Sequence, residues 1–429
     1  MIIPEKQPVD LLLIHAGTLL TLDNSHPGPL RGSETEDLGK VLDAAVAMQG
    51  ETVVAVGSTQ EMQSRFSATH ILDAHGRLVL PGWVDCHTHP VFSGTRENEF
   101  AMRVAGSSYE EIARTGGGIR SSVRTLRSTE TDDLLDLLLQ RLDQFLLMGT
   151  TTIEAKSGYG LSTHDEVRSL EVIQHANQIH PIDLIPTFMG AHEFPDEFRS
   201  HRDRYIDLII QEMIPQIADQ NLARFCDVFC ENEVFSVEES KRILLAAKEA
   251  GMLLKIHAEE LAATGGARLA IELGCTSADH LVQIPDADII QMARSSVVAV
   301  LLPGTTFHLG KKKYAPAQIM YEAGLPIALA TDFNPGSSMT QSLPMITTLA
   351  CLQLGLSPHA ALAGITRNAA CALDLDRSHG RISPGYQADL LVVDAPNFDY
   401  LPYHYASNRV HTVIKRGKIV VSEGVRRIP

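Results

Sequence analysis

Nearly continuous apolar segments alternate with amphipathic ones through the middle of the chain. An unbroken apolar run is typical of a strand buried on both faces. Such runs occur at 150–157, 183–192, 225–231, 253–259, 277–281, 296–303 and 326–333. Apolar residues recur at helical spacing in segments between these runs, at 131–148, 164–179, 236–250 and 262–273. The alternation predicts an α/β fold in which helices cover a parallel sheet.

The two ends of the chain contain short strands of another kind. We expect strands at 10–22, 53–57 and 71–80, then at 388–395 and 411–424, the last being a hairpin that turns near Arg416 and Gly417. Residues 24–40 are rich in turn formers and predict a loop. Neither end has enough strands for a sheet alone. We therefore expect a composite β-sandwich domain from residues 1–80 and 383–429.

The region between these ends, residues 81–382, has room for eight strand–helix units. Eight such units make a (β/α)8, TIM-like barrel. A doubly wound open sheet is the competing architecture. Polar residues recur at the C-terminal ends of many predicted strands, whereas a doubly wound sheet gathers them at one switch point. This distribution favours the barrel.

Histidines and one carboxylate stand at these strand ends. His87 and His89 are two residues apart, so they share one face of an extended segment. His257 lies late in a strand, and Asp332 ends another. The strand ends of a barrel converge on one pocket, so these four side chains can meet around one transition metal ion. Cys86 would point to the opposite face and is not assigned to the metal.

Two further histidines, His192 and His280, also stand at predicted strand ends. Each polar residue at a strand end also has an ordinary structural explanation. His192 and His280 can each be hydrogen-bonded core histidines, and Asp332 can cap a helix. Lys156 is interpreted as structural. For one residue the structural explanation is at least as good as the chemical one, but the ordered set favours a metal site.

The motifs "PGWVDCHTHP", "SADH" and "ALATDFNPG" resemble the amidohydrolase superfamily. Within it, "HTHPVFSGTRENEF", "GTTTIEAKSGYGL", "TFMGAHEFP" and "KIHAEE" are similar to the branch that hydrolyses the cyclic amide of 4-imidazolone-5-propanoate to N-formimino-L-glutamate in histidine degradation. The resemblance extends from about residue 78 to "GRISPGYQADLLVVD", and residues 28–45 look like an extra loop. It implies the same barrel and β-sandwich. It also implies one divalent or trivalent ion, zinc or iron, held by His87, His89, His257 and Asp332.

The resemblance also suggests roles for the remaining polar residues. Asp332 would hold or deprotonate the attacking water, and Glu260 would carry protons to the departing nitrogen. His280 and His192 would polarise the carbonyl group. The expected catalytic residues are thus Glu260, His280, Asp332 and His192.

A substrate that carries a propionate group needs a cation. Arg96 is expected to bind it, because guanidinium groups pair bidentately with carboxylates. The ordinary alternative is an ion pair between Arg96 and Glu97 or Glu99. The full set of expected substrate-binding residues is Arg96, Tyr109, Tyr159, His192, Glu260, Asn334, Gly336 and Ser337.

The amino-acid composition limits the kinds of molecule that the protein is expected to bind. Lysine and arginine total 36 against 52 aspartate and glutamate, a formal net charge of −16, which disfavours nucleic-acid binding. Six cysteines form no C-x-x-C pair, and no apolar stretch is long enough to span a membrane. We expect a cytoplasmic protein with a small-molecule substrate, and the resemblance suggests a homodimer.

Three rival functions share parts of this pattern. A mononuclear deaminase of a purine or pyrimidine base would keep the metal ligands but would not need Arg96. A dinuclear amidase of the hydantoinase or dihydroorotase kind would bind two metal ions. A non-enzymatic relative that acts through assembly would be expected to lose the ligands, which this chain retains.

Overall fold

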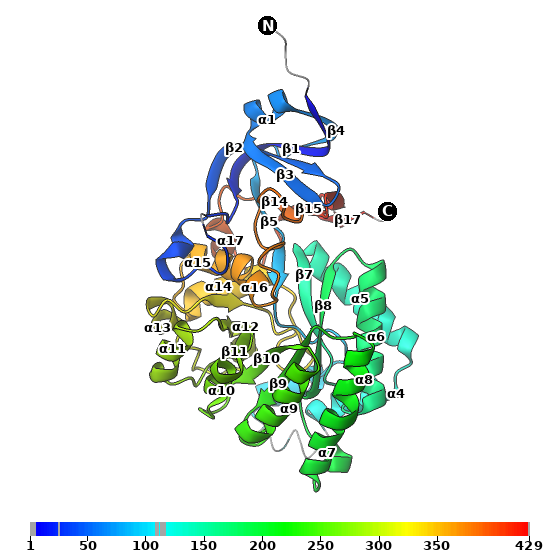
Figure 1. Ribbon diagram of the computed structural model, residues 1–429. Helices are drawn as coiled ribbons and strands as arrows, with labels where there is room; N and C mark the ends of the chain where they lie inside the picture. The colour runs from blue at the N-terminus through cyan, green and yellow to red at the C-terminus, as the bar shows by residue number, and fades with distance from the viewer. Residues whose placement is uncertain (1–5, 25, 108–110, 112–116, 428–429) are drawn as a thin grey trace.

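The chain folds into a parallel barrel and a separate sheet built from both termini, as a computed structural model shows (Figure 1). The structure describes residues 6–24, 26–107, 111 and 117–427. Eight strands follow one another around the barrel in chain order. They are β6 (Trp83–Asp85), β7 (Thr150–Lys156), β8 (Asp183–Ala191), β9 (Phe225–Cys230), β10 (Leu253–Ala258), β11 (Ser277–His280), β12 (Val298–Leu301) and β13 (Ile327–Leu329). The expected barrel is confirmed, and the open-sheet alternative is wrong.

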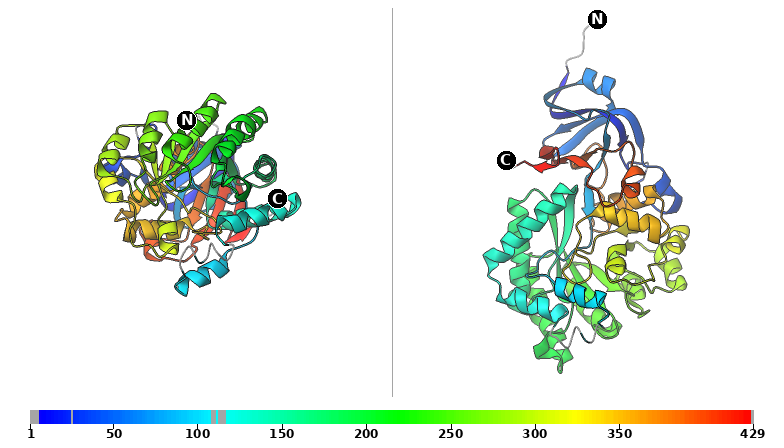
Figure 2. Two further views of the ribbon diagram at one scale, coloured as in Figure 1. Left: turned by 90° about the horizontal axis from the view of Figure 1, so that it is seen from below. Right: turned by 180° about the vertical axis from the view of Figure 1, so that it is seen from behind.

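Helices surround the barrel strands, as the view along the barrel shows (Figure 2). Their apolar faces pack on the strands; in α5 (Thr131–Leu147), the residues Leu134, Leu138 and Leu142 recur every four positions and are buried. A reciprocal capping box of Ser236 and Glu239 begins α9 (Val237–Glu249). The other α-helices in the described part of the barrel region are α2 (Glu97–Val104), α4 (Ile119–Ser128), α6 (Thr163–Ile179), α7 (Arg202–Leu208), α8 (Ile214–Asp219), α10 (Gly266–Leu273), α11 (Asp286–Ala293), α12 (Pro303–His308), α13 (Ala317–Glu322), α14 (Leu343–Gln353), α15 (Pro358–Gly364) and α16 (Arg367–Cys371).

Strands from both chain ends are hydrogen-bonded into one nine-stranded sheet. The antiparallel pairing of β5 with β14 joins the strands from the N-terminal end of the chain to those from the C-terminal end. The strands are β1 (Gln7–Leu20), β2 (Lys40–Gln49), β3 (Thr52–Ser58), β4 (Phe66–Asp73), β5 (Leu78–Pro81), β14 (Leu390–Val393), β15 (Val410–Lys415), β16 (Lys418–Ser422) and β17 (Val425–Arg426), with the short helices α1 (Thr59–Arg65) and α17 (Tyr400–Tyr403) beside them.

The prediction of a loop at 28–45 is wrong for residues 40–45, which belong to a strand. Residues 32–36 form a single 3-10 turn, and β2 begins at Lys40. Arg31 donates to the carbonyl oxygens of Ala293 and Gly324, at the ends of two barrel helices. This segment therefore connects the terminal sheet to the barrel.

The terminal sheet lies at the end of the barrel where the strands begin. Asp183, the first residue of β8, forms ion pairs with Lys415 and Arg416 of the terminal sheet. The C-terminal ends of the barrel strands face away from that sheet (Figure 1). This opposite end is where barrel enzymes carry their chemistry.

Candidate metal centre

The barrel closes where its first and last strands meet. The backbone N–H of Asp332 donates to the carbonyl oxygen of His87 at 3.0 Å, and the N–H of His89 donates to that of Phe333 at 2.9 Å. A parallel bridge pairs Thr88 with Phe333. Closure therefore brings the two histidines beside an aspartate from the far end of the barrel sequence.

Three donor atoms converge at this closure. The Nε2 atoms of His87 and His89 are 3.4 Å apart, and Asp332 Oδ1 lies 3.5 Å from the first and 3.6 Å from the second. Ligand atoms about 2.1 Å from a tetrahedral metal ion are separated by about 3.4 Å. All three side chains are buried. The spacing fits one metal ion.

His257 and His280 add imidazoles from the neighbouring strands β10 and β11. The ring centroid of His257 lies 4.5 Å from that of His87 and 5.5 Å from that of His89. One ring nitrogen from each of His87, His257 and His280 lies within 4.8 Å of the other two. The structure thus brings the four expected ligands into one cluster, and His280 belongs to the same cluster.

Carboxylates determine which nitrogen of two ligands faces the metal position. Asp279 Oδ2 lies 2.6 Å from His87 Nδ1, and Asp227 Oδ2 lies 3.0 Å from His257 Nδ1. Asp279 accepts a hydrogen bond from His87 Nδ1, and the negative charge of Asp227 favours a proton on His257 Nδ1, so each Nε2 presents a lone pair. Converging lone pairs in a buried cluster repel one another unless a cation lies between them.

Burial also keeps the histidines neutral. Desolvation lowers the pKa of His87 and His89 well below the usual histidine value, and neighbouring cations and imidazoles lower it further. Neutral imidazoles are the form that binds metals. Three imidazoles and one carboxylate are typical of mononuclear zinc and iron(II) sites. The residues present therefore fit a single divalent metal ion.

Glu260 and His280 stand next to each other at the rim of the site. His280 Nδ1 lies 3.6 Å from Glu260 Oε2, and Lys311 Nζ lies 3.8 Å from Glu260 Oε1. His280 has a backbone φ of +77°, and both Glu259 and Asp332 have a φ of +51°. Non-glycine residues in this region are strained, and such strain concentrates at functional sites.

His192 and Tyr159 form the wall beside His89. The ring of His192 stacks on that of His89 with centroids 5.1 Å apart, and Tyr159 is 5.3 Å from His192. His192 Nδ1 donates to the carbonyl oxygen of Gly158 at 2.9 Å. Both rings are therefore placed beside the metal position.

Arg96 lies between Glu99 and the loop after β13. Its Nε and Nη2 donate to Glu99 Oε2 at 2.9 and 2.7 Å, so the expected ordinary ion pair exists. The Nη1 atom lies so close to Gly336 that a Cβ atom there would meet it at 2.2 Å. Glycine at 336 thus makes room for the guanidinium beside the loop that carries Asp332.

The loop after Asp332 uses most of its own polar groups. Asn334 Oδ1 accepts from the N–H groups of Gly336 and Ser337 at 2.8 Å, and its Nδ2 donates to Asp332 O and Ser337 Oγ. These bonds hold the loop in shape and leave Asn334 little capacity for a ligand. Tyr109, the remaining expected contact, lies outside the described residues.

Sequence analysis interpreted Lys156 as structural but missed the network of buried charges to which it belongs, beneath the candidate ligands. Lys156 Nζ donates to Glu154 and Asp227, and Lys255 Nζ donates to Glu154. The sequence does contain one sign of this network. In several apolar strands a charged residue stands two positions from another polar residue, and residues two positions apart lie on the same face of a strand. The pairs with this spacing are Asp85 and His87, Glu154 and Lys156, and Lys255 and His257.

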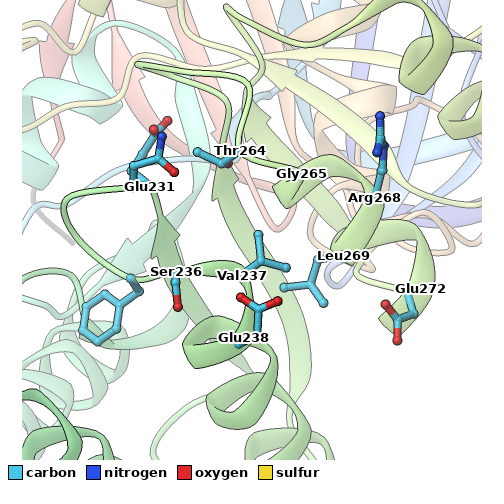
Figure 3. Close-up of a pocket in the computed structure, with 11 residues that line it drawn as sticks. Glu231, Ser236, Val237, Glu238, Thr264, Gly265, Arg268, Leu269 and Glu272 are labelled. Atoms are coloured by element: carbon cyan, nitrogen blue, oxygen red, sulfur yellow. The ribbon is translucent and has the colours of Figure 1, made fainter.

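A separate hollow of about 410 Å³ lies beside the loop that carries Glu260. Figure 3 shows its lining residues, which come from the segment leading into α9, the first turn of α9, and α10 with the two residues before it. Glu231, one of these residues, accepts the backbone N–H of Leu261 at 2.8 Å. The hollow contains none of the metal-site residues.

Comparison with known proteins gives the family. The model of the amidohydrolase family matches residues 112–421. An imidazolonepropionase from Symbiobacterium thermophilum is 46% identical over 98% of this chain and 100% of its own length. One from Geobacillus kaustophilus is 44% identical over 96% of this chain and 98% of its own length. The chain belongs to the imidazolonepropionase family.

Solved structures of two other enzymes share the fold of this imidazolonepropionase family member. A zinc-bound adenosine deaminase from Xanthomonas campestris has a TM-score of 0.75 at 20% identity, covering 99% of this chain and 96% of its own. Zinc-bound atrazine chlorohydrolase from Arthrobacter aurescens, with atraton, has a TM-score of 0.72 at 17% identity, covering 98% and 97%. Among the described residues, no helix is long and apolar enough to cross a membrane.

Proposed function

We propose that this chain hydrolyses the ring amide of 4-imidazolone-5-propanoate to N-formimino-L-glutamate, a step of histidine degradation. Membership in the imidazolonepropionase family and a site suited to cyclic C–N hydrolysis support this function. The observation that carries it is the donor set at the barrel closure, with His87 Nε2 and His89 Nε2 each within 3.6 Å of Asp332 Oδ1.

The metal would be one zinc or iron ion per chain, held by His87, His89, His257 and Asp332. Such an ion lowers the pKa of a bound water toward about 7 and so supplies hydroxide at neutral pH. The side chains of the protein then have to orient the substrate and move protons. Their positions suggest a division of these tasks.

Asp332 and Glu260 are the proposed proton carriers. Asp332 directs Oδ1 at the metal position, while Thr305 donates to its other oxygen, so the carboxylate is fixed to accept a proton from the attacking water. Glu260 can pass a proton to the ring nitrogen that leaves. His280, 3.6 Å from Glu260, would polarise the substrate carbonyl group.

Arg96 is the proposed partner of the propionate. Glu99 holds one edge of the guanidinium, while Nη1 lies on the side of Gly336. A carboxylate that reaches Nη1 gains a charge-assisted hydrogen bond. This contact would favour an anionic ring substrate over a neutral base.

A direct assay separates this function from that of a base deaminase. We expect the purified protein to remove the absorbance of imidazolonepropionate and to release no ammonia from adenosine, guanine or cytosine. Ammonia release without turnover of imidazolonepropionate would overturn the proposal in favour of a deaminase.

We further propose a cytoplasmic homodimer. All six cysteines lie in the described part of the chain and are free thiols, which suits a reducing compartment. Light scattering coupled to size-exclusion chromatography should give a molar mass twice that of one chain. A mass equal to one chain would rule out the dimer.

A further inference from the structure

Five charged side chains are buried in the barrel beneath the metal position, and the proposed mechanism uses none of them. Each has essentially no exposed surface. They come from four strands, β7, β9, β10 and β11, and they are Glu154, Lys156, Asp227, Lys255 and Asp279.

One branch of this cluster runs from Glu154 to His257. Glu154 Oε1 accepts from Lys156 Nζ at 2.8 Å, and Lys156 Nζ also donates to Asp227 Oδ2 at 2.6 Å. The same Asp227 oxygen lies 3.0 Å from His257 Nδ1. Lys156 thus fixes the carboxylate that orients one metal-ligating imidazole.

The other branch runs from Glu154 to His87. Glu154 Oε2 accepts from Lys255 Nζ at 2.9 Å, and Lys255 Nζ lies 3.7 Å from Asp279 Oδ2. That oxygen is 2.6 Å from His87 Nδ1. Lys255 Nζ also donates to the carbonyl oxygen of Cys86, the residue before His87, at 2.8 Å. This branch therefore holds both the ring and the backbone of its ligand.

Glu154 is the only one of the five that reaches both lysines. It contacts no metal ligand by its side chain, and its Oε1 accepts a further hydrogen bond from Thr187 Oγ at 2.6 Å. We propose that Glu154 is a shared positioning residue, which fixes the imidazoles of His257 and His87 through Lys156 and Lys255. The inference rests on the metal-dependent function proposed above. Groups that orient metal-ligating histidines affect metal affinity strongly even though they do not touch the ion.

The test is the rate at which the metal-loaded protein releases zinc to an excess of chelator. In Glu154→Gln, the amide presents one acceptor and one donor, so it can satisfy only one of the two lysines. We expect zinc release to be about tenfold faster than in the wild type. The visible absorption bands of the cobalt-substituted variant should also shift, because two ligands lose their fixed orientation.

A milder variant guards against misfolding. Thr187→Val removes one hydrogen bond to Glu154 and leaves every charge paired, so we expect zinc release to accelerate by up to about fivefold. Lys415→Met is the matched control: Lys415 is equally buried and pairs with Asp183 and Asp389, at the far end of the barrel. It should lower the melting temperature without changing zinc release.

The outcomes separate this inference from the proposed function. Wild-type release rates and cobalt spectra in folded Glu154→Gln and Thr187→Val would overturn the positioning role. Equal acceleration by Lys415→Met would also overturn it, because the effect would then be one of general stability. Faster release in protein that does not hydrolyse imidazolonepropionate would support the positioning role and refute only the reaction. A wild type that binds no metal would refute both.

Discussion

The Nδ1 atom of His192 donates to the carbonyl oxygen of Gly158. A carbonyl oxygen only accepts, so Nδ1 carries the proton and Nε2 presents a lone pair. Burial lowers the pKa of His192 to about 3, so this neutral form persists through the neutral pH range. His192 can therefore accept an N–H group of the substrate. It does not fit the carbonyl-polarising role that the resemblance suggested.

Glu166 holds the loop that fixes His192. Its buried carboxylate accepts the N–H groups of Gly158, Gly160 and Leu161 at 2.8 to 3.0 Å. In Glu166→Gln, one acceptor becomes a donor that faces these N–H groups, so the loop shifts. We expect kcat/KM to fall on the order of ten- to a hundredfold with metal content unchanged. Glu171→Gln, an exposed change on the same helix, is the control; equal kinetics in both variants would contradict the prediction.

Arg96→Ala should weaken substrate binding. The loss of a charge-assisted hydrogen bond predicts a KM raised on the order of 10- to 100-fold, with metal content intact. The methyl ester of the substrate should be a poor substrate for the wild type and no worse for the variant. An unchanged KM would remove Arg96 from the carboxylate site.

Gly336→Ala tests the same contact from the other side. The added methyl group would meet Arg96 Nη1 at 2.2 Å, so the guanidinium has to move while its charge remains. We expect KM to rise, by less than in Arg96→Ala. Steady-state kinetics with the wild-type KM would show that this position of Arg96 does not matter for binding.

Glu260→Gln should affect turnover and leave the metal in place. Removal of a general acid–base group lowers kcat about 10²- to 10⁴-fold. Lys311→Met, which removes the cation 3.8 Å from Glu260, should change kcat far less. Metal analysis beside steady-state kinetics checks both; wild-type turnover in Glu260→Gln would end its proposed role.

The buried side chain of His180 should make the free energy of unfolding depend on pH. It lies between α6 and β8, where its Nδ1 accepts the N–H of Ile182, and burial lowers its pKa to about 4. In the unfolded chain a histidine titrates near pH 6.5. The unfolded state therefore binds the proton first, and the stability present above pH 6.5 is lost as the pH falls toward 4.

Urea unfolding at several pH values measures this loss. From the difference in the pKa of His180 between the folded and unfolded states, we expect a loss of up to about 3 kcal/mol in the free energy of unfolding. His180→Gln lacks the titrating group, so its stability should fall less steeply between pH 6.5 and pH 4. Parallel curves for the wild type and the variant would contradict the assignment.

The barrel was predictable because its strands are buried on both faces. Their apolar runs stand out from the amphipathic helices, and β7 to β10 fall within one residue of their expected ends. The segment from Lys40 to Gln49 was not recognised as a strand. It contains alanine and methionine, which do not favour strands, and it is extended because β1 and β3 pair with it on either side.

The convergence of the strand-end histidines with Asp332 was predictable, but the groups that support them were not. His87 and His89 follow from strand alternation, whereas Asp227 and Asp279 reach the histidines from other strands through the fold. The positive φ angles of His280 and Asp332 leave no mark in the sequence, because both are ordinary residues forced into that conformation by the strand ends. The tautomer of His192 likewise depends on a carbonyl group 34 positions away in the chain.

The most direct test of the account is a metal titration of the chelator-treated protein, followed by the hydrolysis of imidazolonepropionate. We expect no activity without metal, a linear rise on addition of zinc or iron(II), and a plateau at one equivalent per chain. A plateau at two equivalents would indicate a dinuclear site. Full activity in metal-free protein would contradict the claim that the barrel closure at His87, His89 and Asp332 holds a hydrolytic ion.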